Sequence, residues 1–192
     1  MKISFLLVLL ACSILTVTAT PCPPTPQTSS PPVSATLELI RQQRYNDAIN
    51  RLEQILEVQP AQPQALTYLA TAQMYSDRDF LKAQKSFEEA FRMGGGATFF
   101  VNHSHEKLAG NEIVDYCRGW LHLRKEGIEF VPSEGEHGFS LAYSKIVECK
   151  QNRWSKSFFH LKFGEKNQNF RGRTGDESEV LLIVALYKKF AL

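Results

Sequence analysis

Residues 45–56 (YNDAINRLEQIL) and residues 80–91 (FLKAQKSFEEAF) repeat one pattern at a spacing of 35 residues. Each segment begins with an aromatic residue and places an alanine three positions later, Ala48 in the first and Ala83 in the second. Larger apolar residues then recur at helical spacing. A repeat of this length is typical of paired helices that bury apolar surface by stacking on neighbouring pairs. Such surfaces usually bind other molecules rather than transform them.

The residues around these segments mark the ends of the expected helices. The helical pattern begins at Thr36, and Pro60 ends the helix of the first segment because a residue before proline avoids helical dihedral angles. Pro63 fits the first turn of the next helix. The glycine triplet at 94–96 ends the helix of the second segment and predicts a linker.

With these features, residues 36–93 resemble two tetratricopeptide repeats. Two positions depart from the family pattern, because Ile55 replaces a small residue and Met93-Gly94 replaces the terminal proline. The resemblance implies a concave groove that binds a protein or peptide partner. The alternative is that the same positions pack against the neighbouring domain. The positions that would line the groove are Gln64, Thr67, Thr71, Met74 and Tyr75.

After the glycine triplet, the apolar pattern changes from helical to alternating. Short apolar or alternating runs, separated by glycine, proline and asparagine, predict six or seven strands. Asp176–Phe190 then predicts a C-terminal helix, with acidic residues in its first turn and Lys188-Lys189 in its last. The runs are Phe99–Val101, Trp120–Leu123, Ile128–Phe130, Phe139–Tyr143, Ile146-Val147 and Phe159–Phe163.

The order of strands followed by one helix resembles the pleckstrin-homology (PH) superfold in its bacterial and GRAM-like forms. The residues that carry this resemblance are Gly119–Leu123, Gly127–Phe130 and Ser144–Ile146. A related small barrel with a capping helix is the alternative. We therefore expect an α+β protein, with helical hairpins over 36–95 and an antiparallel PH-like barrel or sandwich, capped by the C-terminal helix, over 96–192.

The first residues predict export. Met1–Ala19 reads as a secretory signal, with Lys2 before a short apolar core and a small-residue cleavage site. Residues 20–35 are rich in proline and predict an extended linker. Leu9–Cys12 also resembles the lipobox of bacterial lipoproteins, so a lipid anchor on Cys12 is an alternative, and an uncleaved anchor is a third. We expect a periplasmic or extracellular protein.

Export permits disulfides. Cys22 lies in the proline-rich segment, so Cys117 with Cys149 is the candidate pair, the alternative being two buried thiols that behave as small apolar groups.

The overall charge excludes a general affinity for nucleic acid. The formal net charge is +2, and removal of Lys2 with the signal leaves +1. Residues 145–173 nevertheless carry eight basic and two acidic residues, a local +6, interleaved with aromatic residues such as Trp154. In a PH-like domain, such a stretch is expected to meet anionic lipid headgroups or another anionic envelope component. The alternative is a solvated face of the sheet. The candidate residues are Lys156, Lys162, Lys166, Arg171 and Arg173.

Catalytic and metal signatures are weak. The sequence has no nucleophile elbow, phosphate loop or dinucleotide fingerprint, so we predict a non-enzymatic protein without a cofactor. His103 and His105 would share one face of a strand and invite a metal hypothesis, but their spacing matches no strong zinc signature, and we predict no metal. The other ligands considered for such a site are Glu106, Cys117, His122 and His137.

Two repeats expose more apolar surface than they can cover. We expect Phe87 and Phe91 to dock on the β domain, so that the chain unfolds as one cooperative unit. The alternatives are that a second copy of the chain or a partner covers this apolar surface. The sequence thus predicts an exported, non-enzymatic protein–protein binding or scaffold protein. The alternative is a lipid-anchored envelope protein whose basic β domain recognises an anionic component.

Overall fold

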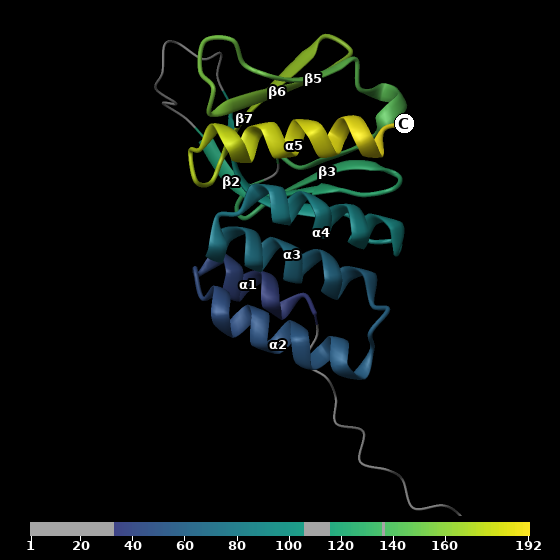
Figure 1. Cartoon of the computed structure of the whole chain (residues 1–192). Coiled ribbons are helices and arrows are strands. Elements are labelled where there is room, and N and C mark those ends of the chain that lie inside the picture. The colour runs from purple at the N-terminus through teal and green to yellow at the C-terminus, as the bar shows by residue number, and fades with distance from the viewer. Residues whose placement is uncertain (1–32, 106–115, 136) are drawn as a thin grey trace, which may run out of the picture.

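The computed structural model describes residues 33–105, 116–135 and 137–192 (Figure 1). The predicted signal, the candidate lipidation site Cys12 and nearly all of the proline-rich linker lie outside these residues, as does Glu106. Within the described parts of the chain, no helix combines the length and the apolar character needed to cross a membrane.

Four helices in two consecutive hairpins form the N-terminal half (Figure 1). Tyr45 and Phe80 are the first residues of the second helix of each hairpin, and Ala48 and Ala83 are buried, as the repeated pattern predicts. Each of these helices packs on its neighbour in sequence. The helices are α1 (Ala35–Arg41), α2 (Tyr45–Val58), α3 (Pro63–Asp77) and α4 (Phe80–Arg92).

Seven antiparallel strands follow in one sheet of order β4-β3-β2-β1-β7-β6-β5. The first four strands form a meander, and the last three return so that β7 pairs with β1. The strands are β1 (Ala97–Ser104), β2 (Tyr116–Leu123), β3 (Gly127–Pro132), β4 (Phe139–Ala142), β5 (Glu148–Gln151), β6 (Phe158–Phe163) and β7 (Lys166–Gly172).

The sheet curls into a half-barrel. Five strand spacings of about 4.8 Å would place β4 about 24 Å from β6 in a flat sheet. The rings of Phe139 on β4 and Phe163 on β6 instead have their centroids 5.6 Å apart, and Phe139 also contacts Phe170 on β7. Aromatic side chains therefore fill the inside of the curl. We refer to this side as the inner face of the sheet and to the opposite side as the outer face.

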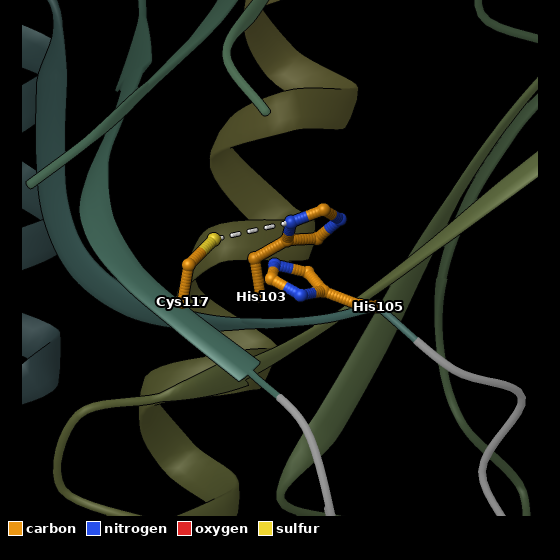
Figure 2. Close-up of side chains that lie close together, drawn as sticks. All are labelled: His103, His105 and Cys117. Carbon is orange, nitrogen blue, oxygen red and sulfur yellow. Dashed lines mark hydrogen bonds between the residues drawn. The ribbon is translucent and has the colours of Figure 1, made fainter. Parts of the chain in front are cut away.

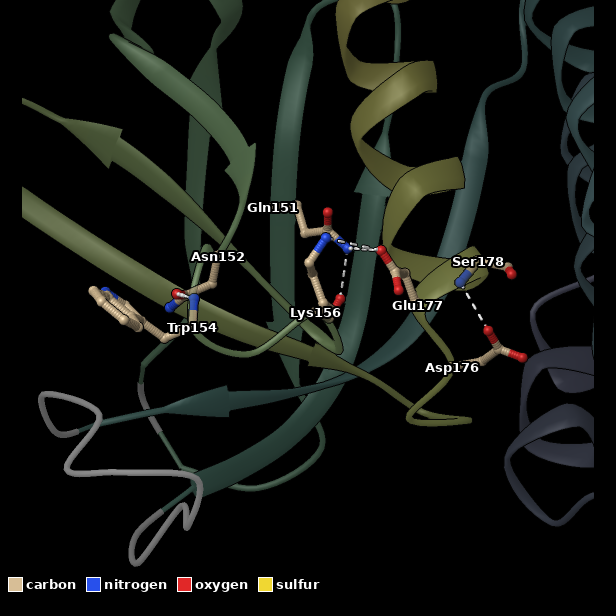
Figure 3. Close-up of polar contacts among 7 residues, drawn as sticks. All are labelled: Gln151, Asn152, Trp154, Lys156, Asp176, Glu177 and Ser178. Atoms are coloured by element: carbon tan, nitrogen blue, oxygen red, sulfur yellow. Dashed lines mark hydrogen bonds and ion pairs between the residues drawn. The ribbon is translucent and has the colours of Figure 1, made fainter.

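The C-terminal helix, α5 (Glu177–Phe190), agrees with its sequence prediction. The Asp176 carboxylate accepts a hydrogen bond from the Ser178 backbone N–H at 2.8 Å, which caps the first turn (Figure 3). Lys188 and Lys189 lie in the last turn, where positive charge is favourable. α5 packs against β5 and α4, so it joins the sheet to the helical half.

One apolar core extends through both halves. The rings of Phe87 on α4 and Phe99 on β1 lie 5.2 Å apart, and Phe91 stacks on Phe190 of α5 at 3.8 Å. The expected docking of the second hairpin on the β domain is therefore confirmed. The glycine triplet is part of this junction, because a Cβ on Gly96 would lie only 2.1 Å from the Leu123 carbonyl oxygen.

The alternating pattern located most strands but missed β7. This strand reads KNQNFRG. Phe170 is its only large apolar residue, so the strand lacks the alternation of apolar and polar residues that predicts a strand. Gly164, at positive φ in the turn before it, is the one signal of a hairpin here. The expected run over Phe139–Tyr143 divides into β4 and a short 3₁₀ turn, and β5 begins at Glu148, after Ile146-Val147.

Candidate functional site

The predicted groove on α3 is occupied by the chain's own sheet. Thr67, Thr71, Met74 and Tyr75 are each at most 5% exposed. Thr71 Oγ1 donates to the Thr98 carbonyl oxygen at 3.0 Å, and the Phe100 backbone N–H donates to Tyr75 Oη at 2.9 Å. The prediction that these four residues bind a partner is therefore wrong, because all four are buried within the chain, Thr71 and Tyr75 by contact with β1.

Gln64, the fifth predicted groove residue, lines a cavity of about 390 Å³ between α3, the glycine triplet and β2. His122 faces this cavity, where its Nδ1 lies 3.0 Å from Thr98 Oγ1. Burial, together with a smaller effect of the nearby Arg124 charge, lowers the pKa of His122 to about 4, so the imidazole is neutral at pH 7. His122 therefore lines a different cavity from His103, His105 and His137, the other histidines considered for a metal.

The basic stretch divides between different surroundings. Lys162 and Arg171 are exposed and share the outer face, because the register pairs Phe158 with Arg171 and Glu148 with Lys162. Lys156 lies in the β5–β6 turn, 3.4 Å from Glu177. The other two predicted residues, Lys166 and Arg173, lie elsewhere.

Lys166 and Arg173 do not belong to the outer surface of β5–β7. Lys166 lines a cavity at the inner face, together with His103 and Phe163. Arg173 is half-buried where the sheet meets α3, with its guanidinium over the rings of Tyr75 and Phe100. Arg173 is therefore a wrong prediction as a residue of an anionic-surface site, because packing at the junction occupies it. Lys166 is exposed but lies beside the inner-face cavity, apart from the outer face.

The turn between β5 and β6 presents an exposed tryptophan. Trp154 is 92% exposed, and its backbone N–H donates to Asn152 Oδ1 at 3.0 Å. Gln151 Nε2 donates to the Lys156 carbonyl oxygen at 2.8 Å and to Glu177 at 3.2 Å. Figure 3 shows these contacts on the side of α5 and the indole projecting away from them. The turn is therefore held in place while its largest apolar side chain meets water.

Positive charge surrounds this turn. Glu148 accepts hydrogen bonds from His160 and Lys150 on the outer face, and these contacts lower the pKa of Glu148 to about 2, so it is ionised. Arg153 and Lys162 have no ion-pair partner among the described residues. We call Arg153, Trp154, Lys156, Lys162 and Arg171 the basic–aromatic surface.

A second group gathers at the opposite side of the sheet. His103, His105 and Cys117 bring their nitrogen and sulfur atoms within 4.8 Å of one another (Figure 2). His137 lies beside them, with its ring centroid 4.4 Å from that of His105. From the spacing along the chain we predicted no metal, and that spacing did not distinguish these residues from His122.

The predicted disulfide does not form. Cys117 Sγ lies 3.5 Å from His103 Nδ1, whereas Cys149 is buried on β5 as a free thiol. The β1–β2 register places Cys117 opposite His103, and no disulfide joins Cys117 to Cys149. Burial raises the pKa of the Cys149 thiol to about 12, which makes it a small apolar group of the core, the alternative given by the sequence.

No protein-family model matches this chain, and no curated protein does either. Among solved structures, the chain is similar to the N-terminal PH domain of the human ARAP2 protein, with 12% identity and a TM-score of 0.38. The match covers 49% of this chain and 76% of that domain. The tetratricopeptide assignment of the helices stays a prediction.

Sequence reasoning identified the basic stretch but not which of its residues act together. Trp154 was one of several interleaved aromatic residues, and only the fold shows that Phe159 and Phe170 are buried while Trp154 is exposed. The signal that distinguishes it is its position between Asn152 and Ser155, two residue types that favour turns.

Proposed function

We propose that this protein is an exported, non-enzymatic binding protein whose sheet half docks on an anionic lipid surface. The observation that carries the proposal is the exposure of Trp154 in a turn that also presents Arg153 and Lys156. Lys162 and Arg171 extend the same positive surface along the outer face of β6 and β7.

The basic–aromatic surface is complementary to a lipid headgroup region. An indole combines a large apolar ring with one polar N–H, which favours the boundary between water and lipid. Each basic side chain close to an anionic leaflet contributes about 1 kcal/mol of attraction. Four basic residues and one tryptophan are therefore sufficient for reversible binding, although none of them needs to contact a specific headgroup.

The rest of the proposal comes from the sequence patterns. The two hairpins are proposed to be tetratricopeptide-type repeats, and the sheet with α5 to be a PH-like domain. Residues 1–19 are proposed to direct export, with a lipid anchor on Cys12 as the alternative. An anchor would place the basic–aromatic surface near a membrane through a proline-rich tether.

A protein partner is a second candidate function. Since β1 fills the groove of α3, a partner must use another face of the helices. A shallow hollow of about 310 Å³ lies between α3 and α4, lined by Leu66, Leu69, Lys85 and Glu89 among others. This hollow supports a scaffold role for the helical half, with a short peptide as the partner.

Tryptophan fluorescence tests the lipid proposal directly. The chain has two tryptophans, and Trp120 is 9% exposed within the sheet, so a change on binding reports Trp154. Vesicles that contain phosphatidylglycerol should shift the emission of the mature chain to shorter wavelength, whereas phosphatidylcholine vesicles should not. Added salt should reverse the shift, because it screens the attraction.

Variants test whether vesicle binding depends on the basic–aromatic surface or is nonspecific adsorption. Trp154→Ala, and Arg153→Gln combined with Lys162→Gln, should each reduce sedimentation with anionic vesicles. The matched controls are Leu81→Ala, which removes an exposed apolar residue of α4, and Lys85→Gln, which removes an exposed charge there. Equal binding to both kinds of vesicle, or equal losses in the variants and controls, would contradict the proposal.

A further inference from the structure

We propose that His103, His105 and Cys117 form a binding site for a divalent first-row transition ion, of which Zn²⁺ is the probe of choice. The site lies at the ends of β1 and β2, on the inner face of the sheet. It is separate from the basic–aromatic surface, which lies on the outer face of β5–β7.

The strand register places the three ligands on one face. His103 and His105 are two residues apart at the end of β1, so their side chains point to the same side of the chain. His103 is directly opposite Cys117 in the β1–β2 ladder. Two residues of one strand and one of its neighbour thus converge without any local motif, which is why the sequence spacing matches no zinc signature.

The distances suit a tetrahedral ion. Bonds of about 2.3 Å to sulfur and about 2.0–2.1 Å to nitrogen place these two ligand atoms about 3.6 Å apart in tetrahedral geometry. Cys117 Sγ and His103 Nδ1 are 3.5 Å apart, and the ligand atoms of all three residues lie within 4.8 Å of one another (Figure 2). Little movement of the His103–Cys117 pair is therefore needed to hold an ion.

The surroundings of His103 orient its ring for coordination. His103 Nε2–H donates a hydrogen bond to Gln168 Oε1, a carbonyl oxygen that can only accept, and this leaves the lone pair on Nδ1, toward Cys117. The ring also packs on Phe170 at 4.9 Å and on Phe130 at 5.1 Å. A hydrogen bond to the second ring nitrogen is the usual support of a metal-binding histidine.

A cavity of about 360 Å³ gives access to the site. Its lining includes His103, His105, His137, Lys166 and Gln168. His137 is close enough to His105 to supply a fourth ligand, or a water completes the coordination. Two imidazoles and one thiolate select zinc or copper over magnesium and calcium, which prefer oxygen ligands. On binding, the Cys117 thiol releases its proton to solvent, and the thiolate offsets the charge of the ion beside Lys166.

The test measures binding of Zn²⁺ to the mature chain, reduced and carrying Cys22→Ser, by competition with a chromophoric chelator. The expected result is one equivalent of Zn²⁺ per chain. Co²⁺ should bind at the same site and give a thiolate-to-metal charge-transfer band that Cys117→Ser removes. His105→Gln should weaken Zn²⁺ binding at least about tenfold, and Gln168→Leu, which removes the orienting contact, by about 10–100-fold.

His160→Gln is the matched control. His160 lies on the outer face of β6, hydrogen-bonded to Glu148, and its loss should leave the Zn²⁺ affinity unchanged. His105 is exposed, so His105→Gln should retain the parent circular dichroism even where Cys117→Ser fails to fold. Absence of Zn²⁺ binding by the parent, or equal weakening in His105→Gln and His160→Gln, overturns the proposal.

Discussion

β1 and β7 are paired neighbours in one sheet, but they have opposite surroundings. β1 reads ATFFVNHS, and seven of its eight residues are buried. β7 reads KNQNFRG, and only Phe170 and Gly172 are buried. The inner faces of both strands contribute to the curled interior. Their outer faces differ, because α3 covers β1 through Thr71 and Tyr75, whereas Arg171 of β7 is exposed.

This difference separates the structural part of the sheet from the part that is free to bind. A strand buried on both faces reads as a continuous apolar run, and substitutions of its residues should lower the stability of the fold. A strand open on one face reads as polar, and its outer residues should affect binding with little effect on stability. The proposed metal site lies at the far end of β1, beyond the residues that α3 covers.

The largest expected effect is at the junction of α4 with β1. Phe87→Ala should lower the free energy of unfolding by about 3–5 kcal/mol, because it leaves a cavity against Phe99. Circular dichroism of the helices and fluorescence of Trp120, measured in a Trp154→Phe background, should show one common transition. Leu81→Ala, 77% exposed on the same helix, is the control and should change stability by less than about 0.5 kcal/mol. Separate transitions for the helices and the sheet would show that the two halves unfold independently and would contradict this prediction.

The buried His122 should make stability depend on pH. Burial lowers its pKa to about 4 in the folded chain, whereas an unfolded histidine has a pKa of about 6.5. Between these values the unfolded state binds a proton that the folded state does not, so stability falls as the pH decreases. The loss should approach about 3 kcal/mol, at 1.36 kcal/mol for each pKa unit.

Urea unfolding at pH 7 and pH 4.5 measures this effect. His122→Asn, which keeps a polar group near the position of Nδ1 beside Thr98, should reduce the difference in stability between the two pH values. Lys162→Gln, at an exposed residue of the outer face without an ion-pair partner among the described residues, is the control and should keep the parent difference. An unchanged difference in His122→Asn would assign the pH dependence to other groups.

The hydroxyl group of Tyr75 should contribute to the stability of the folded chain. Tyr75→Phe leaves the Phe100 backbone N–H without its acceptor and Glu179 without one donor, at an expected cost of about 1–3 kcal/mol. Tyr116→Phe, at an exposed tyrosine of β2, serves as the comparison and should be close to neutral. Chemical denaturation of the two variants under identical conditions distinguishes them, and equal stabilities would show that the junction does not depend on this hydrogen bond.

The smallest effect on stability is expected on the open face. Lys162→Gln should change the free energy of unfolding by less than about 0.5 kcal/mol, because Lys162 is exposed and has no ion-pair partner in the described residues. The same variant should lower the affinity for anionic vesicles. A large loss of stability without a loss of vesicle binding would reverse the roles assigned to β1 and β7.

Helical elements could be predicted well because their signals are local. Pro63 begins α3 through its fixed φ, and the Asp176 carboxylate caps the first turn of α5. Most strands could be predicted from alternation, but β7 could not, because its outer residues meet water and its inner residue Gln168 hydrogen-bonds His103 instead of joining the apolar core. Alternation reports burial on one face, and β7 buries too little for the pattern to appear.

The candidate sites were less predictable from the sequence. Thr71 and Tyr75 have the pattern of groove residues, but whether a partner or the chain's own sheet fills that groove depends on distant residues such as Thr98 and Phe100. Cys117 could have paired with Cys149 or with a histidine, and the β1–β2 register places it opposite His103. Spacing along the chain carries no information on such contacts.

The sequence by itself determined the two helical hairpins, the change to a sheet after the glycine triplet and the C-terminal helix, because caps, breakers and apolar periods act through neighbouring residues. Only the tertiary structure decided that β1 occupies the face of α3, that Trp154 is exposed and that His103, His105 and Cys117 converge. These outcomes depend on strand register and on the curl of the sheet. Both are set by the packing of the whole core, in which residues far apart in the chain must bury one another.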